Sequence, residues 1–202
     1  MEERTFREGA LYNPGSMARN DGGVHDLIDL LAAMSGKKTD VPDQLELFLD
    51  MAERAVKVVS AVFAAKSDEV AILFLTVDGK HLRFAAPRKF ASLGTIPVTK
   101  RDSIAVGVFE KQKGEAMNNV PMIRHVAFFE SVKLRDRVVP IQKMITVPIM
   151  FDGRAVGVAQ VSRKGDSPMD AGPDFGPGDV RKAQDIFEQV APFFVEALPD
   201  KF

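Results

Sequence analysis

Apolar and polar positions follow two different rhythms along this chain, and together they predict an alternation of helices and strands. Apolar residues spaced three and four apart predict helices, whereas short apolar runs bounded by Gly, Pro, Asn and Asp predict strands. The predicted helices are residues 24–34, 42–65, 104–113 and a segment that begins after Gly176. The predicted strands are residues 70–77, 81–85, 95–98, 144–150 and 154–162. The order predicts a mixed α+β fold.

Two Asp-Gly pairs predict hairpins. Asp152-Gly153 joins strands 144–150 and 154–162, and a type I′ turn there needs two residues that tolerate positive φ. Asp78-Gly79 predicts a second hairpin, between strands 70–77 and 81–85. Because proline cannot donate a ladder hydrogen bond, Pro97 predicts an edge strand.

The first long helix and the last helix each carry an apolar stripe with heptad-like spacing. The first stripe is Leu45, Phe48, Ala52, Ala55, Val59 and Val62, widened by Leu49, Val56 and Phe63. The second stripe is Ala183, Phe187, Val190 and Phe194. Either each stripe covers the sheet of its own subunit, or its edge also packs against a second subunit. We expect a homodimer through these terminal helices.

Residues 1–40 are expected to form a loose N-terminal arm with a short helix, and residues 41–202 a single domain. The length of 202 residues and the apolar content of 46% fit one domain with a single full hydrophobic core. A net charge of -1 provides no general attraction for nucleic acid, and no apolar run approaches the roughly 20 residues that span a bilayer. The charged start MEERTFREG is not a secretory signal, so we expect a cytoplasmic protein without nucleic-acid or membrane partners.

The absence of cysteine limits the chemistry. It excludes disulfides, thiolate metal sites and thiol nucleophiles. The histidines His25, His81 and His125 show no metal-binding spacing, so no metal site is expected. Serines and carboxylates are scattered without a nucleophile motif, so no catalytic residue is assigned and the protein is not expected to be an enzyme.

The least regular part of the core, residues 118–141, is interpreted as a helical crossing that forms a lid over the sheet. Aromatic side chains there and nearby would form the walls of a pocket, and amide and basic groups would contact a ligand. The candidate ligand-binding residues are Phe84, Phe109, Asn118, Asn119, Arg124, His125, Phe128 and Phe129. Arg124 could hold a carboxylate or phosphate, and His125 could titrate near neutral pH. The alternative is structural: phenylalanines in the core, a turn at Asn118-Asn119, and Arg124 and His125 on the surface.

The order of these pieces resembles the GAF domain family over roughly residues 45–198. The resemblance rests on a long helix, a hairpin, the helix SIAVGVFEKQKGE, the Asn118-Asn119 pair, the hairpin VPIMFDGRAVGVAQV, and F-x-x-x-D opening the last helix. It implies an antiparallel sheet of five or six strands, with the N- and C-terminal helices packed on one face and a ligand-pocket lid on the other. It also implies small-molecule sensing in signal transduction, as in bacterial-type regulatory domains, with no particular ligand or cofactor named.

Lys164, Phe175 and Asp179 stand where cyclic-nucleotide-binding GAF domains carry N-K-x(n)-F-x-x-x-D-E, although Arg163 and Val180 replace the Asn and the Glu. We interpret Lys164 and Asp179 as a structural ion pair. Family members that reduce free methionine sulfoxide or attach a bilin use cysteine, which is absent here. The leading hypothesis is a sensor that binds a ligand between sheet and lid and signals through a dimer or a separate effector protein. The alternative is a GAF-like dimerisation or interaction module with no ligand.

Overall fold

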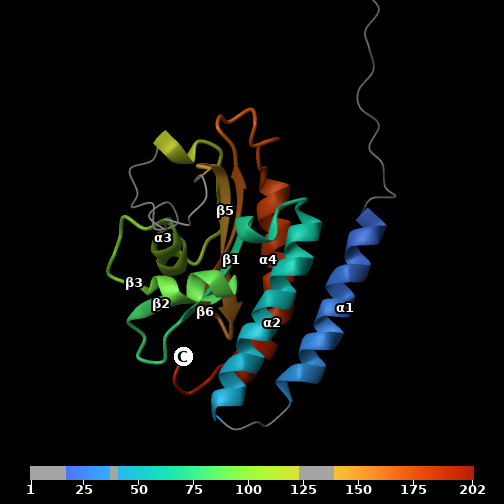
Figure 1. Ribbon diagram of the computed structural model, residues 1–202, viewed down its shortest axis with the longest axis vertical. Coiled ribbons are helices and arrows are strands. Elements are labelled where there is room, and N and C mark those ends of the chain that lie inside the picture. Colours follow the sequence, from blue (N-terminus) through green and yellow to red (C-terminus); the bar gives the residue numbers. More distant parts are fainter. Residues whose placement is uncertain (1–16, 37–40, 123–138) are drawn as a thin grey trace, which may run out of the picture.

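The computed structural model describes residues 17–36, 41–122 and 139–202, which form a six-stranded antiparallel sheet with helices on both faces (Figure 1). The strand order is β3-β2-β1-β6-β5-β4. The strands are β1 (Val70–Leu75), β2 (His81–Ala86), β3 (Thr95–Pro97), β4 (Glu115–Met117), β5 (Ile141–Phe151) and β6 (Arg154–Lys164). The predicted α+β class and strand number are confirmed.

Two long helices, α2 (Val41–Val62) and α4 (Pro177–Ala197), cover one face of the sheet, and α3 (Ile104–Lys111) covers the other (Figure 1). Side chains alternate along β1: Ile72 packs with α2 and α4, whereas its neighbour Leu73 packs with α3. Three 3-10 turns, η1 (Ser67–Glu69), η2 (Arg88–Leu93) and η3 (Val120–Met122), connect these elements. The predicted placement of both terminal helices on one face is confirmed.

Both predicted hairpins form, with different turns. Asp152 and Gly153 have φ of 48° and 72°, so both occupy the positive region that a type I′ turn requires. In the first hairpin, by contrast, Gly79 has a φ of 71° and its N–H donates to the carbonyl of Thr76 at 2.8 Å. The edge strand containing Pro97 is confirmed, because β3 is the last strand on its side of the sheet.

The N-terminal helix α1 (Met17–Ser35) is longer than predicted and packs on the domain. It begins at Met17 rather than at Val24, because Gly22 and Gly23 lie inside the helix instead of forming a turn. Leu27 and Leu31 are 2% and 0% exposed, and the helix lies against α2 and α4 (Figure 1). This part of the expected arm is therefore not loose.

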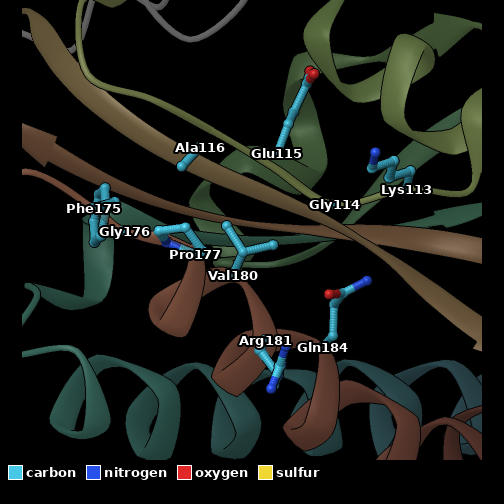
Figure 2. A pocket seen from close by; sticks show the side chains of 10 residues that line it. All are labelled: Lys113, Gly114, Glu115, Ala116, Phe175, Gly176, Pro177, Val180, Arg181 and Gln184. Carbon is cyan, nitrogen blue, oxygen red and sulfur yellow. The ribbon is translucent and has the colours of Figure 1, made fainter.

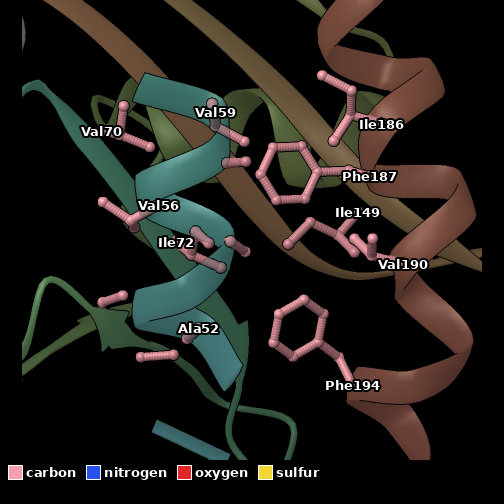
Figure 3. Packing of buried hydrophobic residues seen from close by; sticks show 14 of the residues in the cluster. Ala52, Val56, Val59, Val70, Ile72, Ile149, Ile186, Phe187, Val190 and Phe194 are labelled. Atoms are coloured by element: carbon pink, nitrogen blue, oxygen red, sulfur yellow. The ribbon is translucent and has the colours of Figure 1, made fainter. Parts of the chain in front are cut away.

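The two apolar stripes meet in the core of this subunit. Phe48 on α2 and Phe187 on α4 are both 0% exposed and belong to one core with Ile72 of β1 and Ile149 of β5. Figure 3 shows Phe187 pointing from α4 toward α2 and the sheet. The interpretation that the stripes cover their own sheet therefore describes the structure. Burial of these side chains removes the centre of each stripe from any contact with a second subunit.

The expected ion pair between Lys164 and Asp179 is replaced by another pair. Lys164 Nζ lies 2.8 Å from Asp68 Oδ2, whereas Asp179 Oδ2 accepts the N–H of Gly176 at 2.8 Å and caps α4. The reason is the turn η1, where the Glu69 carboxylate accepts the N–H of Lys164 at 2.8 Å and holds Asp68 beside it. Partial burial raises the pKa of Asp68, but the hydrogen bond and charge of Lys164, with the charge of Lys89, outweigh it and lower that pKa below its ordinary value.

Candidate functional site

The predicted ligand-binding residues fall into two groups. Arg124, His125, Phe128 and Phe129 lie outside the described residues. Phe84, Phe109, Asn118 and Asn119 are described. Phe84 is 0% exposed between the sheet and α3, with its ring 5.7 Å from that of Phe90, and half-buried Phe109 packs against the same cluster. Both phenylalanines therefore contribute to the core on the α3 side of the sheet.

Asn118 has a structural role that the sequence analysis did not predict. Its Nδ2 donates to the carbonyl of Phe175 at 2.9 Å, and its Oδ1 accepts the N–H of the same residue at 2.9 Å. The side chain therefore replaces a backbone partner for Phe175 and joins the end of β4 to the start of α4. Its neighbour Asn119 is exposed.

Replacing Asn118 with alanine should destabilise the fold by about 2 kcal/mol, because the N–H and C=O of Phe175 would both lose their partner. Asn119→Ala is the matched control, and the exposure of this side chain predicts a change within about 0.5 kcal/mol. Urea unfolding followed by circular dichroism measures both. Equal midpoints for the two variants would contradict the structural role of Asn118.

The three residues of the nucleotide-type motif all have structural partners. Lys164 pairs with Asp68, Asp179 caps α4, and the ring of Phe175 lies 4.4 Å below the guanidinium of Arg163. The substitution Arg163, which departs from the motif, thus supports the phenylalanine by a cation–π contact. These contacts account for the motif residues without a nucleotide.

A polar pair lies on the α3 face of the sheet, in the middle of the β5/β6 hairpin. Thr146 of β5 is directly opposite Gln160 of β6, and their exposed fractions are 1% and 4%. Gln160 is also opposite Ala71 and two residues from Val158, both of which belong to the cluster under α3. The alternation of strand side chains therefore directs Thr146 and Gln160 to the α3 face.

Gln160 holds an oxygen that has no partner. Its Nε2 donates to Thr146 Oγ1 at 3.1 Å and to the sulfur of Met144 at 3.2 Å. Its Oε1 is the one buried side-chain polar atom in the described part of the chain that lacks a hydrogen bond. Such an atom costs about 1–3 kcal/mol, so a group that supplies a donor there is favoured. The sequence signal for this pair is that Thr and Gln interrupt the inward positions of two apolar strands.

A concavity of about 600 Å³ lies at the edge strand β4 and the first turns of α4 (Figure 2). Ala116, Phe175 and Val180 line its floor, and Lys113 and Arg181 lie at its rim. The groove is open to solvent, and its rim carries charge of both signs because Glu115 stands beside Lys113. No sequence pattern predicted this groove.

The described residues contain no cluster of three or more His, Asp or Glu side chains that could hold a metal ion. None of the described helices is both long enough and apolar enough to cross a membrane.

No family model matches the sequence, and no curated protein does. Solved structures match the fold. The GAF domain of an Acinetobacter phosphoenolpyruvate-protein phosphotransferase superposes with a TM-score of 0.63 at 10% identity, over 92% of this chain and 96% of that one. The chain has the GAF fold. The GAF domain of A. aeolicus nlh2 in an inactive state superposes with a TM-score of 0.56 at 15% identity, over 89% of this chain and 97% of that one.

The GAF fold also occurs in an enzyme among the similar structures. The free methionine-R-sulfoxide reductase of Neisseria meningitidis, solved with its substrate, has a TM-score of 0.61 at 14% identity and covers 98% of both chains. At such low identities the likeness concerns the fold, and the residues of this chain must supply any functional argument.

Proposed function

We propose that this chain is a small-molecule-sensing domain whose ligand binds on the α3 face of the sheet, beneath the segment of residues 118–141. The observation that carries the proposal is the unpartnered Oε1 of Gln160, an acceptor in an otherwise packed region. A bound ligand that donates to this oxygen would remove the cost of leaving it unpaired. The protein would act inside the cell.

The surroundings of Gln160 have the composition of a ligand site. Met144, which contacts the Gln160 amide, belongs to a small apolar cluster with Ile104 of α3 and Val120. Ligand sites combine such apolar walls with a few fixed polar groups. Arg124 and His125, from the sequence analysis, would supply further polar contacts.

Asn118 offers a route from the ligand to α4. The amide of this residue holds the backbone of Phe175 on both sides. Gly176, the next residue, caps α4 together with Asp179. A ligand that moved Asn118 would therefore shift the start of α4. A separate effector protein or a second subunit would read that shift.

Native mass spectrometry of freshly purified protein tests the proposal by showing a copurified small molecule and the number of subunits together. We also expect a nucleotide, amino acid or organic acid to raise the melting temperature, and Arg124→Ala to remove that rise. A crystal structure with side chains filling the space at Gln160, together with no thermal response to any ligand class, would overturn it.

The alternative function, an interaction module without a ligand, was based on the two apolar stripes. Their central residues Phe48 and Phe187 are both 0% exposed, and α1 lies against α2 and α4 on the side away from the sheet (Figure 1). A dimer through the terminal helices would have to use the outer surfaces of these helices. The buried polar pair at Thr146 and Gln160 favours the sensing function over this alternative.

A further inference from the structure

We propose that the ligand presents a lactam or carboxamide edge to the sheet, with its N–H on Gln160 Oε1 and its carbonyl on the hydroxyl of Thr146. This inference rests on the proposed function and specifies its chemistry. It depends on the hydrogen bonds within the polar pair, on the register of β5 and β6, and on the charges around them.

The hydrogen bonds of Gln160 fix which of its atoms is free. A primary amide carries two N–H donors on nitrogen and acceptor sites on oxygen. Both donors of Nε2 are used, one by Thr146 Oγ1 at 3.1 Å and the other by the sulfur of Met144 at 3.2 Å. The free atom is therefore Oε1, which can only accept, so the ligand must bring a donor.

Thr146 supplies the complementary group. Its Oγ1 accepts from Gln160, which leaves the hydroxyl proton available to donate. The register places Thr146 directly opposite Gln160 across β5 and β6, and the side chains of such cross-strand pairs are neighbours. One ligand group can therefore meet an acceptor and a donor together, and a lactam or carboxamide presents the matching donor and acceptor side by side.

The charges near the pair disfavour an acidic ligand. Glu115 of β4 is directly opposite Thr146, and side chains of such cross-strand pairs lie on the same face of the sheet. Lys143 on β5 is 6% exposed at its side chain and is committed to Asp174 at 2.7 Å. A carboxylate or phosphate on the ligand would therefore meet Glu115 and the oxygen of Gln160, while Lys143 is already paired.

Two small probes that differ in one hydrogen-bond donor test this inference on the full chain. 2-Pyridone has a lactam N–H beside its carbonyl, and N-methyl-2-pyridone lacks the N–H. Titration followed by NMR should show 2-pyridone binding about tenfold more tightly, the ratio expected for one buried hydrogen bond. The side-chain amide signals of Gln160, identified by their loss in Gln160→Met, should shift with 2-pyridone.

Three variants locate the binding. Gln160→Met and Thr146→Val should each weaken 2-pyridone binding about tenfold and reduce its preference over the methylated probe. Two variants are used so that one remains if the other does not fold. Gln142→Met is the matched control. Gln142 is a buried glutamine on β5 whose Nε2 donates to the carbonyl of Gly165 at 2.8 Å, so its replacement should leave probe binding unchanged.

Equal affinities for the two probes, no binding of either, or unchanged binding in Gln160→Met and Thr146→Val would overturn the inference. A crystal structure with an ordered water on Oε1 in the presence of 2-pyridone would also overturn it. These results would leave the proposed function standing if native mass spectrometry or the thermal screen still found another ligand on the α3 face. The absence of every ligand would overturn both.

Discussion

Gly157→Ala should leave little or no folded protein, with a loss of at least about 3 kcal/mol in unfolding free energy. Gly157 lies in β6 opposite Phe74 of β1, in the middle of the sheet. A Cβ at this position would stand 2.3 Å from the carbonyl oxygen of Leu73 and 3.1 Å from the Cα of Phe74. Both are backbone atoms of a central strand that is paired on its two sides, so neither can move away without breaking the sheet.

Gly178→Ala is the matched control for this prediction. Gly178 lies in the first turn of α4, and a Cβ built there meets no atom within 4 Å. Alanine should therefore change the unfolding free energy by less than about 1 kcal/mol, in the stabilising direction that helix propensity predicts. Soluble yield and urea unfolding measure both variants. A Gly157→Ala protein with the parent's unfolding midpoint would show that β1 and β6 do not approach this closely.

Phe48→Ala should lower the free energy of unfolding by about 3–5 kcal/mol, the range for replacing a fully buried phenylalanine with alanine. Phe48 of α2 makes edge-to-face contacts with Phe74 of β1, Phe194 of α4 and Phe202, at centroid distances of 5.1, 5.9 and 4.9 Å. It therefore joins the sheet, both long helices and the segment that follows α4. Its removal leaves a cavity among three elements that are held by other contacts and cannot close it fully.

Phe193→Ala provides the comparison, because Phe193 precedes Phe194 on α4 but is half-buried at the margin of the same core. We expect Phe193→Ala to lower the unfolding free energy by less than half as much as Phe48→Ala, because the half-buried side chain of Phe193 buries less apolar surface on folding. Thermal and urea unfolding of the two variants give the ratio. Equal losses would show that the aromatic cluster does not concentrate stability at Phe48.

Residues close in sequence account for most of the successful fold predictions. The type I′ turn at Asp152-Gly153 depends on a few adjacent residues. The start of α1 was predicted too late because Gly22 and Gly23 favour a turn locally. Packing of Leu27 and Leu31 against α2 and α4 stabilises a longer helix that includes both glycines.

The candidate site was harder to predict because its contacts join distant segments. Asn118 was expected to contact a ligand, but its partner is Phe175, which lies 57 residues away in the chain. Lys164 was expected to pair with Asp179, which follows it in the sequence. Its partner is Asp68, which lies 96 residues before it and which η1 brings beside its ammonium group. Thr146 and Gln160 are polar residues at inward positions of two apolar strands, but only the register of β5 and β6 shows that they are neighbours.

The sequence by itself determined the α+β class, the two hairpins and the order of most helices and strands, because each follows from periodicity or turn chemistry within a few residues. The short strand β4 was not predicted. Only the tertiary structure decided which polar groups meet: the hold of Asn118 on Phe175, the Lys164–Asp68 pair, and the free oxygen of Gln160 beside Thr146. The physical reason is that a hydrogen bond depends on distances of about 3 Å between atoms, which strand register and helix docking set and local pattern does not.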